Sequence, residues 1–403
     1  MNILFLHRNF PAQFRHVAPA LASNPNNRVV FITNNDTITL PNITKVVYKT
    51  KREVPNDAHR YLKFVEESII HAQATAESAI MLKNRGFVPD VIYGHTWGQT
   101  MFMKDVFPDV PLLCYFEWFY QAKNSDIGFD GKKIDVDELA KLRTKNAHLL
   151  IDLYSCDAGL CPTKFQASQF PKEFQHKIKV MHDGVDTDFC SPDDNAVFTV
   201  KDKNLTFTAK DEVVTYATRG MEAYRGFPEF MKSAEILLKK RPNLHIIVAG
   251  EDRVCYGPKL AGTTYKKFMT KMLDLDMNRL HFVGSLPFNE YVNLLRISSA
   301  HVYLTYPFVC SWSMLDSMSC GCPLIASNTP PVTEFVKDGE NGILFDFYNI
   351  EDQVRKIEFA LDNPELMKPL RINARKTIVE NYALKDLLPK HLEYIKSIAK
   401  RNG

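Results

Sequence analysis

Two serines and an aspartate close to residue 310 stand where a nucleotide phosphate could bind. Ser311 and Ser313 flank Trp312 at the predicted start of a helix, and Asp316 follows three residues after Ser313. Serine is a favoured N-cap, and the first turn of a helix offers unpaired backbone N–H groups that suit a diphosphate. Asp316 could complete a capping-box-like arrangement or bind the hydroxyls of a ribose. Ordinary helix capping explains the same residues, so composition alone does not decide.

Two arginines follow another predicted strand, residues 213–217. Arg219 comes two residues after that strand, and Arg225 is followed directly by Gly226. Two guanidinium groups on one loop match the charge and the bidentate hydrogen-bonding geometry of a diphosphate. The structural alternative is a surface arginine that pairs with Glu222.

Two further strand ends carry ionisable groups. His95 lies in the segment GHTWG, residues 94–98, and Glu117 lies in the segment YFEWFY, residues 115–120. Burial among aromatic rings would raise the pKa of Glu117 and make it a proton acceptor or a ligand of a sugar hydroxyl. The alternatives are an ordinary polar residue in an aromatic loop for Glu117 and a scaffold histidine for His95. The aromatic residues suit either a sugar face or a protein core.

The elements that precede these candidate residues in the sequence are predicted to be strands of parallel sheets. Short apolar runs alternate with longer amphipathic stretches, which is the pattern of βα units around a parallel sheet. Ligands of such sheets bind beyond the carboxyl ends of the strands, where the residues above lie. The predicted strands are 3–7, 29–33, 45–48, 90–94, 112–116, 159–161 and 178–181 in the first half, and 213–217, 244–249, 280–283, 301–304, 324–326 and 343–345 in the second. We also expect one helix over 137–155, and over 187–212 an interdomain linker that could include a small hairpin.

The composition is that of a globular protein and excludes some classes of function. Fifty Lys and Arg against 47 Asp and Glu give a net charge of +3, which does not favour nucleic-acid binding. We find neither an apolar run long enough to span a membrane nor a signal peptide. The eight cysteines form no C-x-x-C pair, which indicates a reducing compartment, so a cytoplasmic protein is expected. Basic runs such as 165–179 are either solvated faces or points of attraction to an anionic membrane surface.

Three Asp-x-Asp sequences could hold a divalent ion. They begin at Asp135, Asp186 and Asp274, and each lies at a helix boundary or between the domains rather than after a strand. We therefore predict no metal site and no cofactor, and we expect Arg219 and Arg225 to neutralise the phosphate charge instead.

A longer segment carries a family resemblance. DSMSCGCPLIAS, which starts at Asp316, and PPVTEFVKDGENGILF, residues 330–345, resemble the nucleotide-binding signature of family-4 retaining glycosyltransferases, which have the GT-B fold. The family carries a Glu-x7-Glu pair, and the resemblance implies that Asp316 replaces its second Glu and holds the donor ribose. The first Glu falls on Phe308, which cannot offer a carboxylate to the donor sugar. Either Ser311, Ser313 and the backbone supply that contact, or the sugar is recognised differently.

Shorter segments resemble the same family. TRGMEAYRGF, residues 218–227, resembles the segment that grips the donor diphosphate, and HDGVD, residues 182–186, resembles the one that leads out of the first domain. VAGED, residues 248–252, and FVG, residues 282–284, resemble loops around the donor base. A family histidine that contacts the reacting sugar is replaced here by Glu117. The donor-binding residues so implied are Arg219, Arg225, Gly226, Gly250, Glu251, Ser311, Trp312, Ser313, Met314 and Asp316, and the candidate catalytic residues are Glu117, His95, Arg219 and Arg225.

These observations predict an α/β protein with two Rossmann-like, doubly wound parallel-sheet domains that face a central cleft. We expect an acceptor-binding domain over 1–190, a nucleotide-sugar-binding domain over 191–383, and a terminal helix over 384–403 that crosses back to the first domain. The resemblance implies metal-independent transfer of a sugar from a nucleotide diphosphate-sugar to a glycan or lipid-linked glycan, with retention of anomeric configuration. Surface polysaccharide or glycolipid synthesis, in the cytoplasm or on the cytoplasmic membrane face, would use such an enzyme. The alternatives are a nucleotide-sugar epimerase and a non-catalytic binding subunit, the latter suggested by Phe308 and Glu117.

Overall fold

The computed structural model describes residues 1–400, which form two compact units. Unit 1 comprises Met1–Gly184 and the C-terminal segment from Lys385, and unit 2 comprises Val185–Leu384. The division falls at Gly184, which has a positive φ of 90°, rather than near residue 190. The segment 187–212 is therefore part of unit 2, where it forms the antiparallel hairpin of β8 (Val197–Val200) and β9 (Leu205–Thr208).

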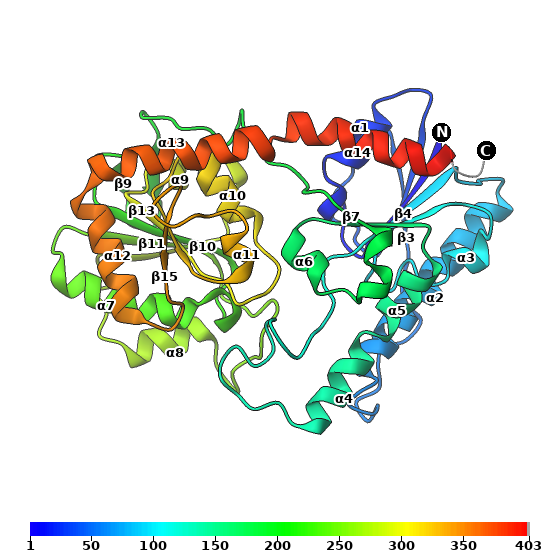
Figure 1. The fold of residues 1–403 in the computed structure, drawn as a ribbon, viewed down its shortest axis with the longest axis horizontal. Coiled ribbons are helices and arrows are strands. Elements are labelled where there is room, and N and C mark those ends of the chain that lie inside the picture. Colours follow the sequence, from blue (N-terminus) through cyan, green and yellow to red (C-terminus); the bar gives the residue numbers. More distant parts are fainter. Residues whose placement is uncertain (401–403) are drawn as a thin grey trace. The chain divides into compact units, whose positions relative to one another are not determined.

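Unit 1 is built on one parallel sheet, with the strand order β3-β2-β1-β4-β5-β6-β7. Figure 1 labels β3, β4 and β7 of this sheet. The strands are β1 (Asn2–Leu6), β2 (Arg28–Thr33), β3 (Ile43–Val47), β4 (Val91–His95), β5 (Leu112–Tyr115), β6 (Ala158–Cys161) and β7 (Ile178–Val180). Its helices are α1 (Val17–Ala22), α2 (Lys63–Asn84), α3 (Met103–Val106), α4 (Val136–Lys145), α5 (Ala147–Ser155), α6 (Lys164–Ser168) and α14 (Leu384–Ala399), with the 3-10 turns η1 (Ala12–Phe14) and η2 (Lys172–Lys177).

Alternating side chains of the central strand β1 enter the two cores of unit 1. Ile3 and Phe5 pack with Ile395 of α14 on one face, while Leu4 and Leu6 pack with Leu82 of α2 on the other. Because successive residues of a strand point to opposite faces, a strand buried on both sides reads as the continuous apolar run seen in the sequence.

Unit 2 has a second parallel sheet, in the order β12-β11-β10-β13-β14-β15. Its strands are β10 (Val213–Gly220), β11 (His245–Glu251), β12 (Leu280–Gly284), β13 (Ala300–Tyr303), β14 (Leu324–Ser327) and β15 (Ile343–Phe345). Its helices are α7 (Phe227–Lys240), α8 (Tyr265–Met272), α9 (Phe288–Arg296), α10 (Trp312–Ser319), α11 (Pro330–Thr333), α12 (Ile350–Asp362) and α13 (Pro364–Asn381), with the 3-10 turn η3 (Ala223–Arg225). Two parallel sheets confirm the predicted α/β class.

The helix expected over 137–155 is two helices, and that prediction was wrong at Asn146. The Asn146 side chain accepts a hydrogen bond from Tyr120 N at 2.9 Å and donates one to Tyr120 O at 2.8 Å. This tie to a distant loop separates α4 from α5. Within residues 1–400, no helix has both the length and the apolar character needed to cross a bilayer.

Candidate functional site

Unit 2 contains a pocket at the carboxyl ends of β10 and β11. Its volume is about 190 Å³, and it is lined by Ala217, Thr218, Arg219, Ala249, Gly250, Ser285, Leu286, Tyr291, Ser311 and Ser313. Strand ends and the start of α10 meet here, which is the ligand-binding edge expected of a doubly wound sheet. Arg219, Gly250, Ser311 and Ser313, four of the residues predicted from sequence, are brought together in this lining.

Gly250 makes the close approach of the two strands possible. Its φ is 136°, and a Cβ at this position would lie 2.2 Å from the carbonyl oxygen of Thr218. Any larger residue would push β10 and β11 apart at the wall of the pocket. The prediction that Gly250 belongs to the site therefore has a steric basis.

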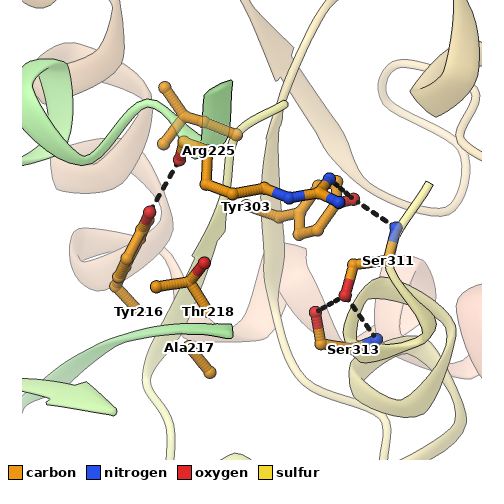
Figure 2. Close-up of a pocket in the computed structure, with 8 residues that line it drawn as sticks. Tyr216, Ala217, Thr218, Arg225, Tyr303, Ser311 and Ser313 are labelled. Carbon is orange, nitrogen blue, oxygen red and sulfur yellow. Dashed lines mark hydrogen bonds between the residues drawn. The ribbon is translucent and has the colours of Figure 1, made fainter. Parts of the chain in front are cut away.

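A narrow recess of about 10 Å³ adjoins this pocket and shares Ala217, Thr218, Ser311 and Ser313 with it. Arg225 lines the recess, and Figure 2 shows its side chain extending toward Tyr303. Its Nη1 donates to Thr305 Oγ1 at 2.8 Å and to the carbonyl oxygen of Val309 at 3.0 Å. The two predicted arginines thus differ, since Arg225 is buried and anchored whereas Arg219 is exposed.

The start of α10 is capped as the sequence predicted. Ser311 accepts a hydrogen bond from Ser313 N at 3.3 Å, and the two hydroxyls lie 2.9 Å apart (Figure 2). Ser311 N donates to the Tyr303 hydroxyl at 2.8 Å, which ties the helix start to the end of β13. Both serine hydroxyls therefore lie in the lining of the pocket, at the N-terminus of α10, where the helix dipole favours an anion.

Other predicted donor residues lie outside the lining. Met314 is fully buried in the core, and Asp316 is 7% exposed on the same helix. Burial and the Asp316 carboxylate raise the pKa of Tyr291, a residue of the pocket wall. Trp312 is half-buried.

Gly226 and Glu251 are not in the lining of the pocket. Gly226 lies next to Leu304 of the recess, and Glu251 is hydrogen-bonded to Ser285 of the pocket. Gly226 begins α7 with a φ of 63°, and a Cβ there would lie 2.5 Å from Leu304 Cβ, so its role is steric. Glu251 is exposed, forms an ion pair with Arg253 and accepts a hydrogen bond from Ser285 Oγ at 3.2 Å.

Glu222 organises the loop next to Arg225, and sequence reasoning treated it only as a partner for an arginine. Its fully buried side chain accepts hydrogen bonds from the backbone of Cys255 at 3.2 Å, Tyr256 at 2.9 Å and Gly257 at 2.7 Å. A Glu three residues before Arg225 was the only signal of this in the sequence, and the partners more than thirty residues away could not be read from it.

Phe308 belongs to an aromatic cluster. It is 7% exposed, and its ring lies 5.5 Å from that of Tyr224 and 5.2 Å from that of Tyr256. The position where the resembling family has a carboxylate is therefore filled by packed rings.

In unit 1, three strand ends bring ionisable side chains together. Because β1, β4 and β5 are neighbours in the parallel sheet, His7, His95 and Glu117 meet at one edge. His95 Nε2 lies 3.6 Å from Glu117 Oε2, and the His7 and His95 rings are 4.6 Å apart. The two candidates predicted from sequence, His95 and Glu117, are thus side by side.

Two members of this cluster were missed. Gln13 joins His7 to Glu117, with His7 Nε2 2.8 Å from Gln13 Oε1 and Gln13 Nε2 2.9 Å from Glu117 Oε1. Burial and the neighbouring His95 lower the pKa of His7 well below its usual range. Both residues lie in the segment 7–13 that follows the first strand. That position, at the carboxyl end of a parallel strand, could have identified them as candidate site residues.

Metal ligands do not gather anywhere in residues 1–400 as a group of three or more His, Cys, Asp or Glu side chains. All three Asp-x-Asp sequences have structural partners, and Asp186 Oδ1 accepts a hydrogen bond from Phe189 N at 3.1 Å. Asp135 caps α4 through Glu138 N, and Asp276 binds Arg279.

Two family models match the chain. A glycosyl transferase family 4 group model matches residues 25–190, and a glycosyl transferases group 1 model matches residues 198–377. The two models therefore meet near the boundary between the units, and together they cover most of the sequence.

Relatives and solved structures agree with these matches. An uncharacterised glycosyltransferase of Haemophilus influenzae is 28% identical over 174 residues, which is 41% of this chain and 44% of the relative. A D-inositol 3-phosphate glycosyltransferase of Mycobacterium sp. is 23% identical over 304 residues, which is 73% of this chain and 62% of the relative. The chain thus matches less than two thirds of the length of either relative. The structure of Anabaena HepE in complex with UDP-glucose has a TM-score of 0.71 at 14% identity, over 98% of this chain and 100% of that one, and shows the same fold.

Proposed function

The chain belongs to the group 1 glycosyltransferases, and on that premise we propose that it transfers a sugar from a nucleoside diphosphate-sugar to a hydroxyl of a glycan or lipid-linked glycan. The observation that carries the proposal is the pocket of unit 2, where Arg219 and the capped start of α10 meet at two strand ends. A diphosphate would find there a cation, two hydroxyls and the positive end of a helix dipole. The solved complex of HepE with UDP-glucose makes a uridine diphosphate-sugar the first donor to try.

The two arginines have separate tasks in this proposal. Arg219 contacts the diphosphate directly from the pocket wall, because its side chain is exposed there. Arg225 lines the adjoining recess and keeps a fixed positive charge beneath the site. Preorganised charges of this kind stabilise the departing diphosphate as the sugar leaves it, and we propose that they do so without a metal ion.

In unit 1 we assign the recognition of a sugar hydroxyl to Glu117 and His95. A gap of 3.6 Å between Glu117 Oε2 and His95 Nε2 is longer than a direct hydrogen bond. A sugar hydroxyl can donate to the Glu117 carboxylate, whose side chain is 18% exposed, and His95 lies buried beside that carboxylate. Neither ring nitrogen of the fully buried His95 has a hydrogen-bond partner within residues 1–400.

The proposed reaction forms a bond between the acceptor oxygen and the anomeric carbon while the bond from that carbon to the diphosphate breaks. The proton of the acceptor hydroxyl leaves with the departing diphosphate on the same face of the sugar, so the anomeric configuration is retained. The proton coupling constant at the anomeric carbon of the product, measured by NMR, would check this, and an inverted product would contradict it.

The donor site is tested by thermal shift of the purified chain with UDP, GDP, ADP, TDP and CMP, with and without EDTA. A ligand that binds only the folded state raises the melting temperature by mass action. We expect one nucleoside diphosphate to raise Tm, equally with EDTA, and Arg219→Ala to abolish the rise. Arg355→Ala is the matched control, because Arg355 lies on α12 of the same unit and its side chain is 75% exposed. A shift that persists in Arg219→Ala would contradict the assigned site.

A non-catalytic binding subunit is the second candidate, and the packing of Phe308 favours it. The place of a donor-binding carboxylate is taken by a ring that Tyr224 and Tyr256 enclose. Such a subunit would show the thermal shift without releasing nucleoside diphosphate from any donor sugar. An epimerase would convert the donor without any acceptor, so assays with and without acceptor separate the three functions.

We further propose that the chain works in the cytoplasm, on membrane-borne acceptors of surface polysaccharide or glycolipid synthesis. The support is the face of α5 beside η2, where Leu150, Ile151 and Tyr154 are 40%, 44% and 81% exposed. Apolar side chains next to the lysines of η2 suit the surface of an anionic bilayer. Flotation with phosphatidylglycerol vesicles should carry the wild type and lose Ile151→Glu, and equal flotation of both would contradict the assignment.

A further inference from the structure

The hydroxyl of Tyr303 lies in the recess, between the Arg225 guanidinium and the start of α10. Tyr303 ends β13, and its ring packs in the core of unit 2 with Met314 of α10. The side chain is 3% exposed, and it lines the recess together with Arg225, Ser311 and Ser313. Because the ring is held by the core, the hydroxyl has a fixed position at the edge of the donor pocket.

The hydrogen bonds around this hydroxyl make its oxygen an acceptor. Ser311 N donates to the Tyr303 oxygen at 2.8 Å. The Cys310 thiol donates to the carbonyl oxygen of Ser311 at 3.8 Å, which leaves its sulfur to accept the Tyr303 proton, also at 3.8 Å. Burial raises the pKa of Tyr303, so the phenol keeps that proton at neutral pH. The start of α10 is therefore tied to a neutral oxygen at the end of β13.

The same oxygen faces the buried cation. Arg225 Nη1 lies 3.5 Å from the Tyr303 hydroxyl, and Figure 2 shows the guanidinium and Ser311 N on either side of that hydroxyl. The guanidinium and the positive end of the α10 dipole repel each other when they converge on one recess. An oxygen that accepts from one and lies beside the other offsets part of this repulsion, so both can stay in place before a ligand binds.

We propose that Tyr303 is a positioning residue, whose hydroxyl holds the capped start of α10 beside Arg225 so that both act on the same diphosphate. This inference rests on the proposed function. Charges that are already in place when the diphosphate departs stabilise it without further rearrangement. The proposal also explains why a residue whose ring alone would fill the core carries a hydroxyl at this point.

The first test needs no ligand. In the full wild-type chain, we expect the Ser311 amide to be protected from hydrogen–deuterium exchange, measured by NMR. Tyr303→Phe keeps the ring and removes the acceptor, so exchange of that amide should become at least tenfold faster. Tyr265→Phe is the matched control, because Tyr265 is 8% exposed in the same unit and its hydroxyl donates to Pro258 O at 3.1 Å. An unprotected Ser311 amide in the wild type, or equal exchange in all three chains, would overturn the proposal.

The second test separates the positioning of phosphate from general support of the pocket. Calorimetric titration with UDP and NMR titration with uridine measure the two affinities, and circular dichroism checks that each variant is folded. We expect Tyr303→Phe to bind UDP about tenfold more weakly than the wild type and to bind uridine equally well, because uridine carries no phosphate. Tyr265→Phe should bind both ligands as the wild type does.

The outcomes of this titration distinguish the inference from the proposed function. An unchanged UDP affinity in Tyr303→Phe overturns the positioning role and leaves the proposed function standing, and an equal loss for UDP and uridine overturns it as well. If the wild type does not bind UDP, the same comparison is made with GDP and guanosine and with ADP and adenosine. A wild type that binds none of the three nucleoside diphosphates contradicts the proposed function itself.

Discussion

The guanidinium carbon of Arg225 lies 5.2 Å from the centre of the Tyr256 ring, so the buried cation at the recess has an aromatic face beside it. Tyr256 is held in this place by Glu222, whose Oε2 accepts the N–H groups of Tyr256 and Gly257. A buried carboxylate thus fixes the loop that borders the cation, and cation–π contact stabilises a charge that has left water.

Replacing Glu222 should therefore loosen the donor side of unit 2. Glu222→Ala leaves three backbone donors without their acceptor, so we expect the free energy of unfolding to fall by about 2–4 kcal/mol. Urea unfolding followed by circular dichroism measures the change. Glu365→Ala is the control, since that side chain is 76% exposed, and equal stabilities of the two variants would contradict the role of Glu222.

Gly250→Ala should damage the pocket itself. The new Cβ would meet the Thr218 carbonyl at 2.2 Å, so β10 and β11 must separate, and we expect nucleoside diphosphate binding to weaken at least tenfold. Gly262→Ala is a matched control, because Gly262 also has a positive φ, 69°, but no atom within 4 Å of the added carbon. Both variants carry backbone strain of about 1 kcal/mol, and only the first should lose the thermal shift.

Asp152 should make the stability of unit 1 depend on pH. Burial raises the pKa of this fully buried carboxyl to about 7. A carboxyl whose pKa is higher in the folded than in the unfolded state favours folding at low pH, and that contribution is lost as the pH rises from about 4 to 7. The isosteric change Asp152→Asn should therefore gain stability over the wild type, from near zero at about pH 4 to about 4 kcal/mol at pH 8.

Chemical unfolding at a series of pH values measures that difference. Asp105→Asn on the exposed surface is the control and should follow the wild-type curve. A difference between wild type and Asp152→Asn that does not change with pH would show that the carboxyl is not kept protonated in the folded chain.

Phe308→Glu, which restores the residue type of the resembling family, should destabilise the protein rather than improve it. The new carboxylate would be enclosed by the Tyr224 and Tyr256 rings, and we expect a loss of about 3 kcal/mol. Phe268→Glu on α8, where the ring is 46% exposed, should cost far less. A stable Phe308→Glu variant with stronger nucleotide binding would mean that the loop can turn this side chain toward a ligand.

The sequence determined the class of fold and the strand ends that matter. Apolar runs such as Val29–Thr33 and Leu112–Phe116 form strands of a parallel sheet that is buried on both faces. Burial on both faces requires consecutive apolar residues, and such runs can be recognised in the sequence. Local rules also predicted the cap at Ser311, because capping depends on near neighbours in the chain, whereas the strand predicted to end at Ala217 continues to Gly220 and includes Arg219.

Tertiary structure alone decided what those residues touch. Nothing local distinguishes Arg225 from Arg219, yet one is anchored to Thr305 and Val309 while the other lies exposed at the pocket wall. The break at Asn146 and the three donors on Glu222 likewise come from residues far away in sequence. Gln13 and Glu117 are separated by 104 residues and meet only because β1, β4 and β5 are adjacent in the sheet. Residue types and local periodicity specify elements, whereas hydrogen-bond partners across a sheet edge depend on strand order, which no short segment encodes.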